Sequence, residues 1–167
     1  MSTPEEWGKG YARQAEADWD TWDKLQRDDA VPQCHKLLFL QMACEKLTKA
    51  HLCTTGSDPR DLQASHAYTA KNLHLVIRHE AANAGIGAKR AAQVVRHTKL
   101  LAQEIELLAP AVKRGGQRPD NCEYPWEDED GRLHVPLDWT FAPSRLLVVP
   151  AGRTFLKLIR QAINRLL

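Results

Sequence analysis

The sequence predicts an all-α protein, an up-and-down bundle of five helices with one long irregular connection before the last helix. Apolar residues recur at three- and four-residue spacing in five separate stretches, which is the periodicity of amphipathic helices. Proline and glycine residues interrupt the pattern between these stretches. The chain has 167 residues, of which 43% are hydrophobic, so it can bury one core and is too short for two domains. We therefore treat residues 1–167 as a single helical domain.

The first helix is expected from Pro4 to about Arg27. Ser2 or Thr3 can cap it, proline suits the first turn, and Glu5 and Glu6 face the positive end of the helix dipole. The apolar stripe of this helix comprises Tyr11, Ala15, Trp19, Trp22 and Leu25.

The second helix is expected from about Pro32 to the break at 54–61, with Gly56 as its terminator. It carries two apolar stripes, one of Leu37, Leu40, Cys44 and Leu47 and one of Phe39, Ala43 and Ala50. A helix with two apolar stripes packs against neighbours on two sides, so we expect it at the centre of the bundle.

Three further helices follow. The third is expected from about Ser65 to the break at 83–87, the fourth ends at Pro110, and the fifth begins after Pro150. Their expected inner positions are Leu73, Ile77, Ala81 and Ala84, then Val94, Thr98, Leu101, Ile105 and Leu108, and finally Phe155, Ile159, Ala162, Ile163 and Leu166.

The connection before the last helix lacks the helical spacing of apolar residues. Four prolines lie within 119–143, and Asp130-Gly131 is a turn signal. Leu133, Val135 and Leu137 alternate with polar residues, so a short hairpin is possible, although Pro136 limits it to an edge. We expect Tyr124, Trp126, Trp139 and Phe141 to pack against the bundle and hold this segment across it. Long connections in compact domains are often functional.

Charge and cysteine content narrow the function classes. The formal net charge is +2, which does not indicate a strongly basic nucleic-acid-binding protein. The basic stretch 112–118 and the acidic stretch 127–130 are either solvated loops or patches that could steer a polyanion. The four cysteines form no CxxC pair, which favours reduced thiols and a cytoplasmic location. No signal peptide, membrane span or membrane partner is expected.

The sequence contains near-matches to two metal-binding motifs, but each lacks residues that the metal requires. HEAAN (79–83) has asparagine where a zinc helix needs its second histidine, and EDEDG (127–131) lacks carboxylates at both ends of a calcium loop. No Walker loop, dinucleotide-binding glycine motif or nucleophile elbow is present. The sequence therefore predicts no metal site and no cofactor.

Two arginine–histidine pairs remain as candidate catalytic groups. Arg90 and His97 project from nearly the same face of the fourth helix, two turns apart. Arg60 and His66 form an alternative pair, with no predicted helix to fix their geometry. An arginine can hold a phosphate while a histidine transfers a proton, and this suffices for metal-independent RNA cleavage by the 2′-hydroxyl.

The stretch LLFLQMACEKLTKAHL (37–52) resembles the signature helix of the HEPN superfamily (higher eukaryotes and prokaryotes nucleotide-binding). That helix typically reads apolar-Gln-x-Ala-x-Glu-Lys-x-x-Lys-Ala, and the matching residues here are Gln41, Ala43, Glu45, Lys46, Lys49 and Ala50. His66 resembles the histidine that often opens the next helix. RPDNCEYPW (118–126) is similar to a Tyr-Pro stretch after the fourth helix in many members.

The resemblance implies an antiparallel four- to five-helix bundle that commonly forms homodimers. Some members are metal-independent ribonucleases of toxin–antitoxin or defence systems, with an Arg-x4–6-His motif. Both pairs fit this length. A polar residue usually follows the arginine in catalytic members; Asp61 fits this pattern after Arg60, whereas Ala91 departs from it after Arg90. Other members bind nucleotides or RNA, or act as partners of minimal nucleotidyltransferases.

These observations lead to one expected function and two alternatives. We expect a nucleotide- or RNA-related HEPN-like module that acts with a partner protein, and the alternatives are a ribonuclease and a structural assembly subunit. Gln41, Glu45 and Lys49 recur at fours on one helix face and are the candidate binding residues, although the same face could be structural support or dimer surface. For catalysis we prefer Arg90 with His97, since one helix holds both.

Overall fold

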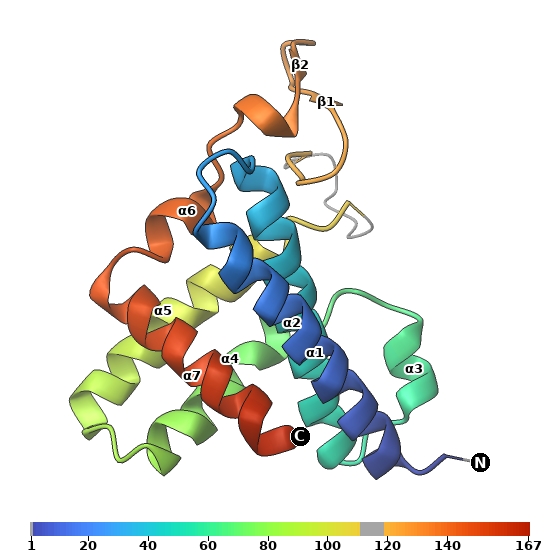
Figure 1. The fold of residues 1–167 in the computed structure, drawn as a ribbon, viewed down its shortest axis with the longest axis vertical. Helices are drawn as coiled ribbons and strands as arrows, with labels where there is room; N and C mark the ends of the chain where they lie inside the picture. Colours follow the sequence, from blue (N-terminus) through green and yellow to red (C-terminus); the bar gives the residue numbers. More distant parts are fainter. Residues whose placement is uncertain (1, 111–118) are drawn as a thin grey trace.

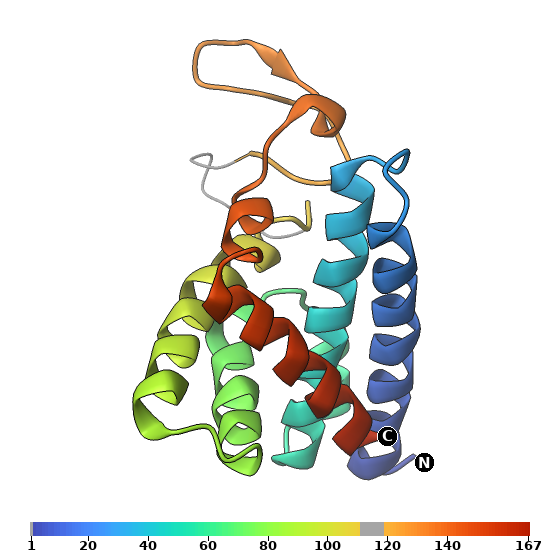
Figure 2. The same ribbon diagram turned by 60° about the vertical axis from the view of Figure 1, so that its left-hand side comes forward.

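The computed structural model describes residues 2–110 and 119–167 and consists mainly of five long helices (Figures 1 and 2). These are α1 (Pro4–Gln26), α2 (Gln33–Thr54), α4 (Thr69–Asn83), α5 (Ala88–Glu106) and α7 (Pro150–Leu166). Two short helices, α3 (Pro59–Gln63) and α6 (Ala142–Leu146), complete the α-helical part of the described chain. The predicted all-α bundle is confirmed.

Helix α1 begins as its sequence predicts and lies along α2. The Glu6 amide donates to the Thr3 hydroxyl oxygen at 3.2 Å, and the Thr3 amide donates to the Glu6 carboxylate at 2.6 Å. These reciprocal bonds form a capping box, which satisfies two amides that a helix start leaves without partners. The buried face of α1 includes Ala12, Ala15, Trp19 and Trp22.

Helix α2 occupies the centre of the bundle, as predicted from its two stripes. Leu37, Leu40 and Leu47 have no exposed surface, and the helix contacts α1, α4, α5 and α7. The chain leaves α2 through Gly56, whose φ of +92° is a conformation that side chains other than glycine rarely adopt.

The predicted third helix is wrong at its start. The chain forms α3 first, because the Asp58 side chain accepts a hydrogen bond from the Arg60 amide at 2.9 Å and Pro59 occupies the first helical position. Arg60 therefore lies in a short helix and not in the expected turn. Helix α4 begins only at Thr69, where the Glu106 carboxylate of α5 accepts from the Ala70 amide at 2.8 Å.

Helices α4 and α5 form the second antiparallel pair, and α7 crosses the bundle obliquely (Figure 2). The predicted inner residues of α5 are buried, as are Phe155, Ile159, Ala162 and Ile163 of α7. Ala84 is an exception to the predicted stripe of α4, because it lies exposed just beyond the end of that helix.

The long connection contains the short hairpin that its sequence allows. Strands β1 (Trp126–Glu127) and β2 (Leu133–His134) pair antiparallel, with Trp126 opposite His134, and the one-turn 3-10 helix η1 (Pro136–Asp138) follows. The hairpin projects beyond the ends of the helices (Figures 1 and 2). The predicted packing of this segment is confirmed for Trp126 and Phe141, which are buried in the core, and is wrong for Tyr124 and Trp139, which are 60% and 37% exposed.

Cys34, Cys44, Cys53 and Cys122 are all buried, and no disulfide joins them. Burial raises the pKa of the Cys44 thiol well above its usual value, which keeps that thiol protonated. Within residues 2–110 and 119–167, no helix combines the length and apolar character needed to cross a membrane.

Candidate functional site

The preferred catalytic pair, Arg90 and His97, makes separate contacts to the α6–α7 region. The Arg90 guanidinium donates to the Thr154 hydroxyl at 3.3 Å, and the His97 Nε2 lies 2.9 Å from the Leu146 carbonyl oxygen. A carbonyl oxygen only accepts, so His97 Nε2 carries a proton and donates it in this bond. His97 therefore fastens the end of α6 to α5.

We expect His97→Ala to lower the free energy of unfolding by about 1 kcal/mol, the net worth of a typical hydrogen bond within a protein. Urea titration followed by tryptophan fluorescence measures this loss. His35→Ala is the matched control, since His35 is exposed on α2 and should change stability by less than about 0.5 kcal/mol. If the two variants are equally stable, the His97 hydrogen bond does not hold α6 against α5.

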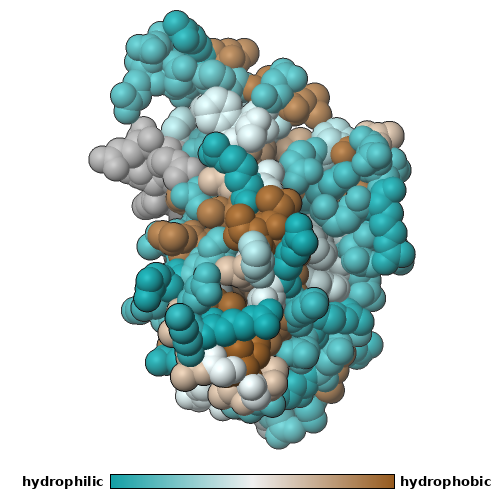
Figure 3. Space-filling view, turned by 90° about the vertical axis from the view of Figure 1, so that its left-hand side faces the viewer, coloured by the Kyte–Doolittle hydropathy of each residue, from teal (hydrophilic) through white to brown (hydrophobic). Residues whose placement is uncertain are grey.

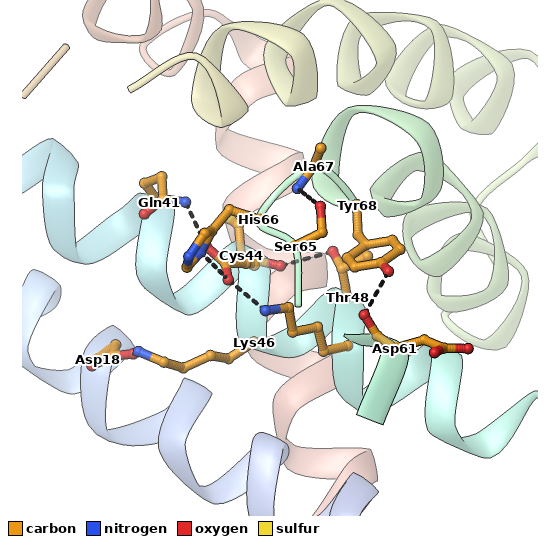
Figure 4. Close-up of polar contacts among 12 residues, drawn as sticks. Asp18, Gln41, Cys44, Lys46, Thr48, Asp61, Ser65, His66, Ala67 and Tyr68 are labelled. Atoms are coloured by element: carbon orange, nitrogen blue, oxygen red, sulfur yellow. Dashed lines mark hydrogen bonds and ion pairs between the residues drawn. The ribbon is translucent and has the colours of Figure 1, made fainter. Parts of the chain in front are cut away.

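The candidate binding residues of α2 meet His66 around one carboxylate, that of Glu45. Figure 4 shows Gln41 and His66 close to each other in this cluster. Glu45 Oε1 lies 2.8 Å from Lys49 Nζ and 2.9 Å from His66 Nδ1. Glu45 Oε2 accepts from Gln41 Nε2 at 3.0 Å. The structure thus joins the three predicted binding residues to the histidine of the alternative pair.

Burial differs sharply across this cluster. Gln41, Glu45 and Lys49 are 3%, 7% and 5% exposed, whereas the His66 side chain is 52% exposed. Burial alone would raise the pKa of Glu45. Hydrogen bonds from Lys49 and Gln41, together with the charges of Lys49 and His66, outweigh it and hold that pKa below its usual value. Glu45 is therefore ionised at neutral pH and accepts from all three partners.

Local sequence explains how the cluster assembles. Spacing by four residues places Gln41, Glu45 and Lys49 on one face of α2.

The turn that carries His66 is shaped by two hydrogen bonds. The Ala67 amide donates to the Ser65 hydroxyl at 3.1 Å, and the Tyr68 hydroxyl donates to the Asp61 carbonyl at 3.0 Å (Figure 4). The buried ammonium of Lys49 also lies 5.9 Å from the centre of the Tyr11 ring of α1.

A pocket of about 620 Å³ opens beside this cluster. Gln41, Glu45 and Lys46 of α2 line it together with His66, and the residues after α5 and Tyr124 of the long connection close its other sides. The volume is in the range of pockets for small ligands. Lys49 does not line the pocket but lies buried beneath it, so its role is to support Glu45.

The alternative pair Arg60 and His66 is not brought into one pocket. Arg60 lines a separate cavity of about 600 Å³ with Trp7 and Asp58, at the start of α1 and α3. His66 lines the pocket beside α2. The partner that the structure gives to His66 is Glu45, which is not part of the arginine–histidine motif.

The geometry of His66 suits proton transfer. An ionised carboxylate only accepts, so Nδ1 of His66 carries a proton and the neutral ring presents its lone pair on Nε2. Among the described residues, no hydrogen bond to Nε2 is formed. Carboxylate-oriented histidines act as general bases in many enzymes because the carboxylate fixes the tautomer and the ring orientation.

Lys46 and Tyr124 line this pocket but were not among the site residues predicted from the sequence. Lys46 forms an ion pair with Asp18 of α1 and also lines the pocket. Tyr124 was expected to pack on the bundle but presents its exposed ring at the pocket edge. The Tyr-Pro stretch was the one available signal for Tyr124.

Comparison with known proteins gives no match to any family model, curated protein or solved structure. The similarity to the HEPN superfamily therefore stays a prediction that depends on the residues of α2, His66 and the Tyr-Pro stretch.

Proposed function

We propose that this protein is a nucleotide- or RNA-binding helical module of the HEPN type, with its ligand in the pocket beside α2. The observation that carries the proposal is the meeting of an oriented histidine, a lysine and an exposed aromatic ring around one pocket of about 620 Å³. Lys46 can donate to phosphate oxygens, the Nε2 lone pair of His66 can accept from a ligand hydroxyl or amino group, and Tyr124 offers a surface on which a base can stack.

The proposal includes a partner protein with which this module acts. The resemblance of α2 to the HEPN signature implies a minimal nucleotidyltransferase as one candidate partner. A neighbouring reading frame that encodes such an enzyme would support this part of the proposal, and co-purification of the two proteins would test it directly.

Tyr124→Ala is expected to weaken binding of a fluorescein-labelled single-stranded RNA or nucleotide about tenfold, because stacking on an aromatic ring contributes roughly 1–3 kcal/mol per base. Fluorescence anisotropy in the presence of a chelator measures the dissociation constant. Tyr124→Phe is the control and should bind like the wild type, since it keeps the ring. Wild-type protein that binds neither RNA nor nucleotide at millimolar concentration refutes the proposal.

A metal-independent ribonuclease is the second candidate function. The specific observation in its favour is the Glu45–His66 contact, which leaves Nε2 available to take a proton from an RNA 2′-hydroxyl. In this case wild-type protein cleaves RNA in chelator and His66→Ala cleaves about a hundredfold more slowly, the usual worth of a general base. His97→Ala should cleave normally, because His97 faces the Leu146 carbonyl.

A further inference from the structure

Charge is segregated along this chain although its net charge is close to zero. Residues 120–138 contain seven Asp and Glu residues and one arginine. Residues 81–103 and 139–167 contain no Asp or Glu and carry nine Lys and Arg residues. The acidic segment includes the projecting hairpin, and the two acid-free segments include most of α5 and all of α6 and α7.

The acid-free segments meet on one side of the bundle and form what we call the basic face. We define the basic face by six exposed residues of α5 and the α6–α7 corner, which are Lys89, Arg96, Lys99, Leu100, Arg145 and Val148. In the described part of the chain, none of its four cations forms an ion pair. Figure 3, which looks onto this side, shows apolar residues gathered in the middle of hydrophilic ones. Leu100 is 57% exposed and Val148 is 61% exposed.

A hollow of about 340 Å³ lies within the basic face, between Leu100 and Arg145. Glu104 also lines it. An apolar depression beside unpaired cations is suited to an apolar side chain that comes from an acidic segment.

The hairpin has the opposite character and an ordered internal structure. Glu127, Glu129 and Asp130 are exposed, and Leu133 and Leu137 are 70% and 64% exposed. Asp128 fixes the turn by accepting from the Arg132 amide at 2.9 Å and by contacting His134 Nε2 at 2.8 Å. The hairpin is therefore a preformed acidic arm with exposed leucines, held clear of its own bundle (Figures 1 and 2).

We propose that the acidic hairpin of one copy docks on the basic face of a second copy, and that the exchange is reciprocal in a two-fold dimer. The two surfaces match in charge, and both expose apolar side chains that would lose contact with water on docking. A closed pair uses both surfaces of both copies at once. RNA is a weaker candidate occupant, because the basic face presents no exposed aromatic ring for a base to stack on.

Paired charge reversals test the proposal. The face variant is Arg96→Glu with Arg145→Glu, and the hairpin variant is Glu129→Lys with Asp130→Lys. Each variant alone sets like charges against each other at both contacts, so each should raise the dimer dissociation constant at least about a hundredfold. Light scattering and sedimentation velocity measure it at low salt. Arg13→Glu with Lys24→Glu, on the exposed surface of α1, is the charge-matched control and should stay dimeric.

An equimolar mixture of the two variants gives the sharpest result. The reversed face then meets the reversed hairpin, and the native face meets the native hairpin, so a heterodimer should form where neither variant dimerises. A monomeric wild type, variants that remain dimeric, or a mixture that stays monomeric would each overturn the proposal. If the wild type is monomeric and the face variant loses affinity for RNA, the basic face is an RNA-binding surface. Ligand binding in the α2 pocket should be unchanged in every variant, which separates this proposal from the proposed function.

Discussion

Replacement of Glu45 by leucine is expected to destabilise the protein by about 3–5 kcal/mol, the cost of leaving a buried charge without its partner. Lys49 is 5% exposed and its ammonium contacts Glu45 at 2.8 Å, so the substitution leaves a cation inside the bundle. Gln41 loses its acceptor as well. Urea unfolding followed by circular dichroism measures the loss.

The double variant Glu45→Leu with Lys49→Met is the matched control. It removes both charges and fills the space with apolar side chains of similar size, and replacements of this kind are often neutral or stabilising. We expect it to recover most of the stability that the single substitution loses. A single variant that loses less than about 1 kcal/mol would show that water reaches Lys49 and that the cluster is not structurally important.

Gly152→Ala should cost about 3 kcal/mol, at the upper end of the usual range for overpacked sites. A β-carbon at Gly152 would lie 2.2 Å from the Leu146 carbonyl oxygen and 2.7 Å from that of Leu147. Both are backbone atoms, so α6 and α7 would have to move apart. The Leu146 carbonyl is also the acceptor for His97, which couples this movement to α5.

Gly10→Ala provides the opposite expectation within the same protein. A β-carbon at Gly10 meets nothing within 4 Å, and the residue lies inside α1. Alanine there should stabilise the protein by roughly 0.5–1 kcal/mol, because glycine loses more backbone entropy on folding. Thermal unfolding of both variants tests the pair. A Gly152→Ala protein as stable as the wild type would show that the α6–α7 corner relaxes easily.

The helices of this fold could be predicted because their signals are local. The Thr3 cap, the two stripes of α2 and the buried spacing of α5 are all visible within a few turns of sequence. The start of α4 was not predictable in this way, since it is capped by Glu106, a residue 36 positions later in the chain. Helix α3 could have been found, because Asp58-Pro59 is a local start signal.

The candidate site was only partly predictable for the same reason. The spacing of Gln41, Glu45 and Lys49 predicted a shared face, and the structure places them on it. The contact between Glu45 and His66 joins residues 21 positions apart and depends on the turn after α3. Arg90 and His97 were correctly placed on one helix, but sequence could not show that α6 and α7 supply partners for both.

The acidic hairpin and the basic face also place opposite charges on separate parts of the described chain. With a formal net charge of +2, two copies repel each other weakly as whole bodies, but in the docking proposed above the acidic hairpin of one copy attracts the basic face of the other before they touch. For that docking, the attraction orients the two copies and raises the fraction of encounters that are productive. Added salt should then slow association more than it speeds dissociation, because screening acts first on charges that are still apart.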